Sequence, residues 1–150
     1  GKEIVLAGGG QVALDVAEFF AENDNHVTIV ELLPQIGGGQ DGFSRQYFRE
    51  LLEKHNATIL TSHRIEAITD EAVVVSGEAG RRELPYDYAF CCLGLRAKPI
   101  DVTVCEELTV CGIQLLCIGD SKQPRLMYDG ILEGRNVIER LKAMGYYENN

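Results

Sequence analysis

The sequence is short of positive charge and of long apolar runs. Lys and Arg total 14 against 23 Asp and Glu, which gives a net charge of -9. This balance argues against a nucleic-acid-binding surface and a polybasic membrane anchor, so we expect neither nucleic acid nor membrane as a partner. No apolar run approaches the roughly 20 residues that span a bilayer. No signal peptide precedes the first strand-like segment, and we expect a cytoplasmic protein.

Cysteine pairs of the C-x-x-C type are also missing, although the chain has five cysteines. Their spacing suggests neither a zinc site nor an iron–sulfur site, so we expect no metal site in this chain. Cys91, Cys92 and Cys117 lie inside apolar runs, where a thiol behaves as a small hydrophobe. We therefore expect buried, reduced thiols.

An initial methionine is missing as well. Gly1 precedes a strand almost at once, which suggests that the sequence is a piece of a longer protein. The length of 150 residues suits about one domain.

The most informative feature lies between residues 4 and 31. Residues 4–7 form an apolar run that predicts a buried strand, and residues 27–30 predict a second strand that leads into Glu31. Between them stands a match to G-x-G-x-x-G/A, a pattern that binds dinucleotides at a strand-to-helix turn. Its six positions are Gly8, Gly9, Gly10, Gln11, Val12 and Ala13. Strand, turn, helix, strand and acid occur in the order that binding of NAD(H) requires.

Several positions of this motif have a physical role in holding a dinucleotide. Gly8 permits the tight turn, while Gly10 lacks a Cβ and lets the pyrophosphate approach the backbone. Ala13 is small enough for the helix to pack closely on the strand. The helix N-terminus offers unpaired N–H groups and about half a positive charge to the phosphates. Glu31 can accept hydrogen bonds from the adenosine ribose, which favours NADH.

The first helix is expected at residues 10–23. Its predicted apolar stripe consists of Val12, Val16, Phe19 and Phe20 at helical spacing. Three consecutive glycines, residues 37–39, lie in the loop after Glu31. These glycines follow no strand and open no apolar turn, so we expect them to provide flexibility rather than to bind phosphate.

Residues 43–94 predict a second helix and five strands. The helix is expected at 43–55, a third parallel strand at 58–61, three short β runs at 64–68, 72–76 and 82–84, and a last strand at 88–93 that ends at Gly94. Arg45 and Arg49 on this helix could reach the 2′-phosphate of NADPH. The three short runs indicate an antiparallel meander. The expected fold is α/β: a Rossmann-like parallel sheet with a three-stranded antiparallel β-meander crossover.

The last third of the chain predicts one strand and one long helix. The apolar strand is expected at 113–118, ending at Gly119-Asp120, and the helix at 127–144. Gly130 and Gly134 lie in this helix, where each costs about 1 kcal/mol relative to alanine. Such a pair indicates a close approach, either of a packed strand or of a ligand.

These motifs together resemble those of flavoproteins with two dinucleotide-binding domains, in which an NAD(P) domain with a β-meander crossover is inserted in an FAD domain. Residues 8–17 are similar to the signature G-G-G-x-x-G-x-E-x-A, with Ala13 for the third glycine and Asp15 for the glutamate. The resemblance implies that Asp15 lies near the nicotinamide; an exposed helix acid is the alternative. Residues 87–94 resemble a second signature, which implies that Gly94 lies near both cofactors.

Residues 118–120 are similar to a third signature of that family, whose aspartate hydrogen-bonds the flavin ribityl chain. The resemblance implies that Gly119 and Asp120 contact FAD in the full-length protein; an aspartate N-cap for the next segment is the alternative. The continuation through residue 134 is most similar to NADH:flavin oxidoreductases. These are the Old Yellow Enzyme relatives, which include 2,4-dienoyl-CoA and 2-enoate reductases.

The resemblance also implies a division of the chain. Residues 1–112 correspond to the NAD-binding domain, and residues 113–150 to the returning C-terminal segment of an FAD-binding domain. The glycine turn that opens the FAD domain is missing, as is the barrel that would hold FMN; an iron–sulfur cluster would also belong to absent domains. The chain is thus expected to position NADH for hydride transfer to FAD in the full-length enzyme, to have those other domains as partners, and to be inactive alone.

Two other functions fit the glycine turn. A nucleotide-sensing module without redox chemistry has the same motif, but it does not predict Gly119-Asp120. An S-adenosylmethionine-dependent methyltransferase also uses a glycine turn and an acid after its second strand, but the early meander argues against it. A short-chain dehydrogenase does not fit, because no tyrosine has a lysine four residues later.

Overall fold

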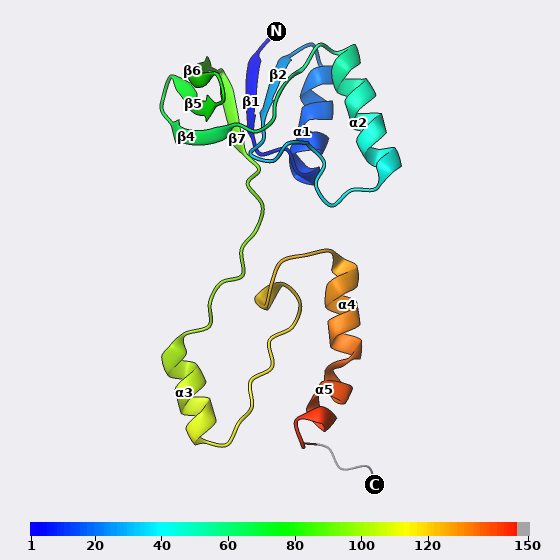
Figure 1. Cartoon of the computed structure of the whole chain (residues 1–150), viewed down its shortest axis with the longest axis vertical. Helices are drawn as coiled ribbons and strands as arrows, with labels where there is room; N and C mark the ends of the chain where they lie inside the picture. The colour runs from blue at the N-terminus through cyan, green and yellow to red at the C-terminus, as the bar shows by residue number, and fades with distance from the viewer. Residues whose placement is uncertain (147–150) are drawn as a thin grey trace. The chain divides into compact units, whose positions relative to one another are not determined.

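The structure is a computed structural model that describes residues 1–146, which fall into two compact units (Figure 1). The first unit is Gly1–Gly94, and the second unit begins at Leu95. The division falls earlier in the chain than the boundary predicted at residue 112, and the assignment of a nucleotide to each segment stays a prediction. No helix among the described residues is long and apolar enough to cross a membrane.

A four-stranded parallel sheet forms the centre of the first unit, in the order β3-β2-β1-β7. Its strands are β1 (Glu3–Ala7), β2 (His26–Val30), β3 (Thr58–Leu60) and β7 (Tyr88–Cys91). Ile4 of β1 lies opposite Val27 of β2 on one side and Tyr88 of β7 on the other. β1 is therefore a central strand, and the glycine turn follows its carboxyl end.

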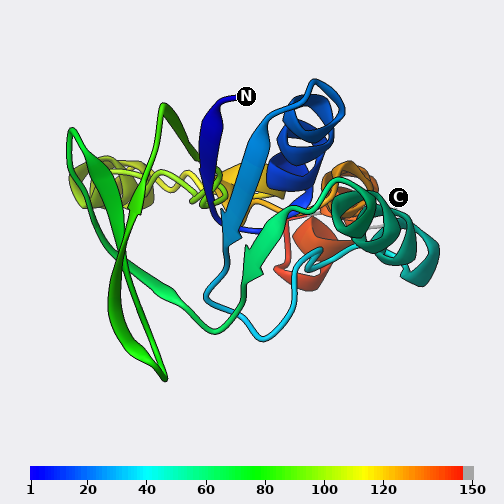
Figure 2. The ribbon, with the colours of Figure 1, turned by 90° about the horizontal axis from the view of Figure 1, so that it is seen from above.

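Two helices and a meander connect these strands. α1 (Gln11–Glu22) joins β1 to β2, and α2 (Gly42–Lys54) joins β2 to β3. The crossover from β3 to β7 is an antiparallel meander of β4 (Arg64–Ile68), β5 (Ala72–Gly77) and β6 (Gly80–Pro85). The helices lie on one face of the parallel sheet and the meander on the other (Figure 2). The predicted Rossmann-like fold with a meander crossover is confirmed.

Alternating side chains of the central strand build a core on each face of the sheet. Ile4 and Leu6 are buried with residues of α1 and α2, because side chains two apart in a strand share a face. Val5, between them, is buried with Val73 and Val75 of the meander. A strand covered on both faces reads as a continuous apolar run, which is why it was recognisable in the sequence.

The apolar stripe predicted for α1 is wrong at two positions. Val12 and Phe19 are 66% and 62% exposed. The buried positions of α1 are instead Ala13, Leu14, Ala17 and Ala21. Three of these four are alanines, so the helix packs closely on the sheet, while Val16 and Phe20 pack at the margin of the same core.

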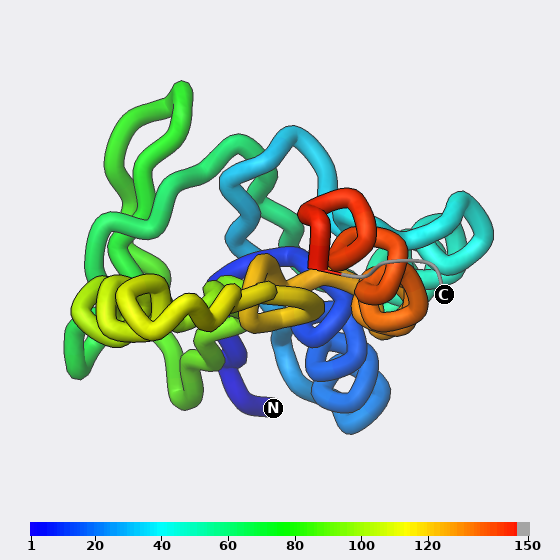
Figure 3. The backbone as a smooth tube through the Cα atoms, turned by 90° about the horizontal axis from the view of Figure 1, so that it is seen from below, coloured from blue at the N-terminus to red at the C-terminus, as the bar shows by residue number. Residues whose placement is uncertain are grey.

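The second unit departs most from the prediction. Its elements are α3 (Val102–Val110), a short 3-10 helix η1 (Gly119–Ser121), α4 (Met127–Arg135) and α5 (Val137–Ala143). Two expectations are wrong, since residues 113–118 form no strand and the predicted helix 127–144 is interrupted at Asn136. In addition, α3 was not predicted. The chain passes from α4 directly into α5 at that point (Figure 3).

The second unit also lacks a core among its described residues, none of which is buried. An extended segment forms a strand only when a neighbour pairs with its N–H and C=O groups. Residues 113–118 have no strand beside them in the described part of this unit, which explains the failed strand prediction.

The expectation of buried thiols is also wrong. All five cysteines are free; Cys91 and Cys111 are exposed, and the other three are half-buried. Cys91 ends β7, which is an edge strand of the sheet. The three cysteines after residue 94 belong to the unit without a described core.

Candidate functional site

The first glycine of the motif is required by the fold. Gly8 has a φ of +105°, and a Cβ built on it would lie 2.5 Å from the carbonyl oxygen of Cys92. The chain is fixed at this point because the Cys92 N–H donates to the oxygen of Ala7 at 2.8 Å and the Gly8 N–H donates to Val30 at 2.8 Å. Only glycine fits a backbone with this φ and this close neighbour.

Gly10 is different, because nothing in the protein surrounds it. It is the N-cap of α1 with φ of −76°, and a Cβ built on it meets no atom within 4 Å. No side chain caps α1, and its first turn holds no acid. The N–H groups of Gln11 and Val12 have no hydrogen-bond partner among residues 1–146. The open space above Gly10 therefore faces unpaired donors and the positive end of a 12-residue helix.

Glu31 lies beside this turn, as its place after β2 predicts. One carboxylate oxygen accepts the Gly9 N–H at 2.6 Å, and the other accepts the Leu33 N–H at 2.8 Å. The Glu31 N–H itself donates to the oxygen of Leu60 at the end of β3. Strand ends thus bring an acid and a helix N-terminus together, which is the arrangement that can take a ribose hydroxyl and a phosphate side by side.

The glycine loop after β2 was expected to be flexible, but part of it is held by hydrogen bonds. Gly37 is buried, and its N–H donates to the carbonyl oxygen of Gly9 at 2.7 Å. The φ of Gly37 is +73°, and its carbonyl oxygen accepts the N–H of Gln40 at 3.1 Å. The prediction of flexibility is wrong for Gly37, whereas Gly38 and Gly39 are exposed with open space around them.

The other predicted positions in the first unit are less informative. Ala13 is fully buried against the sheet, as expected for the third glycine position. Asp15 is exposed and makes no hydrogen bond or ion pair with the described residues, so both of its alternatives stay open. Gly94 ends the unit with a φ of +83° and open space around it.

Gly119 and Asp120 lie in the second unit, within η1. The alternative that Asp120 caps a helix is wrong, since η1 is capped by Ile118 and α4 by Leu126. The Asp120 side chain is exposed and makes no hydrogen bond within residues 1–146. Gly130 packs near Gly119, but a Cβ built on it would lie 3.7 Å from the Cα of Gly119, which is ordinary van der Waals contact and does not require glycine.

A half-buried glutamate that sequence reasoning missed holds this turn. Glu133 of α4 accepts the Gly119 N–H at 2.7 Å, the Lys122 ammonium at 2.8 Å and the Arg125 guanidinium at 2.6 Å. The hydrogen bonds from Lys122 and Arg125 lower the pKa of Glu133 from its ordinary 4.5 to about 2. The sequence shows only that Lys122, Arg125 and Glu133 follow Gly119-Asp120. Their pairing could not be predicted, because it depends on the fold.

We expect the Gly119 amide to report the charge of Glu133. Because the folded-state pKa is depressed, the contact is complete above pH 4.5 and is lost as the pH falls through about 2. In nitrogen-15 spectra, the Gly119 amide proton should therefore shift with a midpoint near 2. Glu133→Gln should remove this titration. A midpoint near 4.5 in the unchanged chain would mean that the two cations do not hold the carboxylate.

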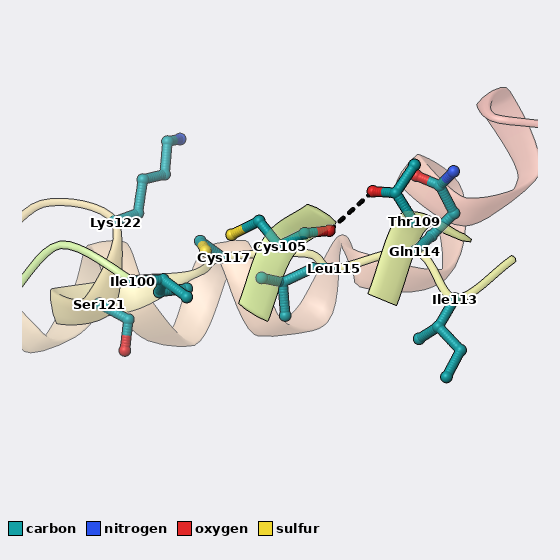
Figure 4. Close-up of a pocket in the computed structure, with 9 residues that line it drawn as sticks. All are labelled: Ile100, Cys105, Thr109, Ile113, Gln114, Leu115, Cys117, Ser121 and Lys122. Atoms are coloured by element: carbon teal, nitrogen blue, oxygen red, sulfur yellow. Dashed lines mark hydrogen bonds between the residues drawn. The ribbon is translucent and has the colours of Figure 1, made fainter. Parts of the chain in front are cut away.

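A cavity of about 490 Å³ lies in the second unit (Figure 4). Its lining residues are Ile100, Cys105, Thr109, Ile113, Gln114, Leu115, Cys117, Ser121 and Lys122. The Thr109 hydroxyl is already used, since it donates to the oxygen of Cys105 at 2.8 Å. Much of this lining is apolar surface of a unit without a described core, so the cavity marks uncovered packing surface rather than a second nucleotide site.

The parallel sheet, the meander crossover and the glycine turn with its acid define a Rossmann-type fold of the dinucleotide-binding class. The chain belongs to the pyridine nucleotide-disulphide oxidoreductase family, whose sequence pattern matches residues 1–110. Members of this family combine NAD(P) with FAD, so the match argues against the methyltransferase alternative. It gives no support to FMN or to an iron–sulfur cluster, and residues 1–146 hold no group of metal-binding side chains.

The individual relatives are oxidoreductases. A bilirubin reductase from Mediterraneibacter gnavus is 31% identical over 120 residues, which are 80% of this chain and 18% of that protein. An NADH oxidase from Thermoanaerobacter brockii is 26% identical over 136 residues, or 91% and 21% of the two chains. The solved complex of 2-naphthoyl-CoA reductase with 2-naphthoyl-CoA has a TM-score of 0.68 and 26% identity, covering 89% of this chain and 20% of that one. The chain thus spans about a fifth of these relatives.

Proposed function

We propose that this chain is the NADH-binding module of a larger flavin-dependent oxidoreductase. The observation that carries the proposal is the pairing of the Glu31 carboxylate with the Gly9 N–H, directly beside the uncapped N-terminus of α1. In this proposal the pyrophosphate lies over Gly10 and accepts the unpaired N–H groups of Gln11 and Val12. The Glu31 carboxylate accepts the hydroxyls of the adenosine ribose.

The protein contributes orientation and electrostatics to this function. NADH supplies the hydride when bound, and no residue of the chain is proposed to be catalytic. The glycine turn fixes the pyrophosphate, and Glu31 fixes the adenosine half, so that the nicotinamide end is directed away from both. Asp15 and Gly94 are proposed to lie along the nucleotide by their match to the family signatures.

We further propose that the parent enzyme belongs to the NADH:flavin oxidoreductases. Sequence matches to the bilirubin reductase and the NADH oxidase extend over 80% and 91% of this chain. Matches to three dihydrolipoyl dehydrogenases extend over only 51% to 65%. Matches over 120 and 136 residues are longer than the first unit, Gly1–Gly94, so they include part of the second unit as well. In this proposal Gly119, whose N–H is held by Glu133, and the neighbouring Asp120 contact FAD once the remaining domains supply the other flavin contacts.

We expect NADH to bind more tightly than NADPH. The 2′-phosphate of NADPH would meet the Glu31 carboxylate as a like charge and would remove the hydroxyl that donates to it. A charge-assisted hydrogen bond contributes about 1.5–3 kcal/mol, which corresponds to a difference in affinity of about 10-fold to over 100-fold. Calorimetric titration of the chain with each nucleotide measures this ratio.

Glu31→Gln is the matched control for this prediction, since it keeps an acceptor oxygen and removes the charge. The variant should have a smaller ratio of NADH affinity to NADPH affinity than the unchanged chain. Tighter binding of NADPH by the unchanged chain would show that a cation, and not Glu31, dominates this end of the site.

A further inference from the structure

Gly9 is enclosed on three sides by the loop that follows β2. Its N–H donates to the Glu31 carboxylate at 2.6 Å, and its carbonyl oxygen accepts the Gly37 N–H at 2.7 Å. On the third side, a Cβ built on Gly9 would lie 2.8 Å from Cγ2 of Ile36 and 3.2 Å from the Glu31 side chain. The middle glycine of the motif therefore contacts the loop on both backbone polar groups and on its Cα.

The far side of the loop is anchored as well. A Cβ built on Gly37 would lie 2.9 Å from Cγ of Arg45 in α2 and 3.1 Å from the amide oxygen of Gln40. The Leu33 carbonyl accepts the Ser62 N–H at 3.0 Å, which ties the loop to the residues after β3. The loop thus has fixed partners in the glycine turn, in α2 and at the end of β3.

We propose that Ile36 and Gly37 are positioning residues for the adenosine half of the nucleotide. They clamp Gly9 against the Glu31 carboxylate, so that the acid already faces the ribose site before the ligand arrives. Neither residue is proposed to react; each acts through Gly9 and Glu31. The inference rests on the proposed function, because a clamp on this carboxylate matters only if a ribose binds there.

The physical benefit of such a clamp is preorganisation. A loop that must be ordered during binding lowers the affinity by the entropy lost, whereas a loop already docked does not. A carboxylate held by two backbone N–H groups also has a fixed direction, and a fixed direction is what discriminates a ribose hydroxyl from a 2′-phosphate. Loss of the clamp should therefore lower both NADH affinity and the preference for NADH over NADPH.

The test is calorimetry of the full chain with NADH and with NADPH. Ile36→Ala removes Cγ2 and leaves Glu31 in place. This variant should bind NADH about tenfold more weakly and should have a smaller ratio of NADH affinity to NADPH affinity. Gly9→Ala should weaken NADH more strongly, because its Cβ would collide with Ile36. The double variant Gly9→Ala with Ile36→Ala should bind NADH more tightly than Gly9→Ala alone, because it lacks the Cγ2 methyl group of Ile36 that the new Cβ would meet.

Gly38→Ala is the matched control, because Gly38 lies in the same loop with nothing within 4 Å of a built Cβ. It should bind both nucleotides as the unchanged chain does, and a melting curve for each variant compares folding. Equal NADH affinity and an equal ratio in Ile36→Ala, or additive losses in the double variant, would overturn the clamp and leave the proposed function standing. Failure of the unchanged chain to bind NADH would overturn both.

Discussion

Gly10→Val is expected to abolish NADH binding while the protein stays folded. The side chain would enter the open space above the N-terminus of α1, where a built Cβ meets no protein atom within 4 Å. The fold has no reason to change, but the pyrophosphate loses its approach to the N–H groups of Gln11 and Val12. Two charge-assisted hydrogen bonds at about 1.5–3 kcal/mol each correspond to a loss of more than about 100-fold in affinity.

Calorimetry with NADH measures this loss, and circular dichroism with a melting curve establishes that the variant is folded. Gly38→Val adds the same group to an exposed loop position with open space, and it should bind NADH normally. A folded Gly10→Val chain with unchanged affinity would place the phosphate away from the helix N-terminus.

Gly8→Ala is expected to lower the stability of the fold, although Gly10, only two residues away, tolerates a side chain. The φ of +105° is unfavourable for alanine, and the new Cβ would lie 2.5 Å from the Cys92 carbonyl oxygen beside β7. Backbone strain and overpacking each cost about 1–3 kcal/mol, so the free energy of unfolding should fall by about 3 kcal/mol or more. For a unit of this size, the melting temperature should fall by more than about 10 °C.

Gly10→Ala is the matched control for stability, since Gly10 has a negative φ and open space. Its melting temperature should stay close to that of the unchanged chain. Equal melting temperatures for Gly8→Ala and Gly10→Ala would mean that the turn after β1 relaxes without loss, contrary to its two short backbone hydrogen bonds.

The fold of the first unit was predictable because its signals are local. The apolar run of β1, the three short runs of the meander and the glycine turn each lie within a few consecutive residues. The buried face of α1 was not predictable from periodicity, because the sheet selects small side chains such as Ala17 and turns Phe19 outward. Spacing indicated a helix, but the packing partner determined which face is buried.

The second unit was poorly predicted because its signals are not local. Residues 113–118 have the composition of a strand, but a strand needs a neighbour that pairs with it. Asn136 interrupts the last helix at a point that helical spacing does not reveal. A sequence pattern can give the propensity of such segments, whereas the partner that fixes them lies elsewhere.

The site shows the same difference. The proximity of Glu31 to the glycine turn follows from the motif, because parallel strands end at one edge of the sheet. The contact of Ile36 with Gly9 and the pairing of Glu133 with Gly119 do not follow from any spacing rule. Both contacts depend on how the fold packs a distant segment, the loop after β2 or α4, against a glycine.

The central claim is that a dinucleotide binds with its pyrophosphate over the N-terminus of α1 and its adenosine ribose at Glu31. The most direct test is a nitrogen-15 NMR titration of the chain with NADH. The amide resonances of Gly10, Gln11 and Val12, together with that of Gly9 beside Glu31, should shift saturably with one equivalent of nucleotide. Saturable binding that leaves these four amides unchanged, or no binding at all, would contradict the account.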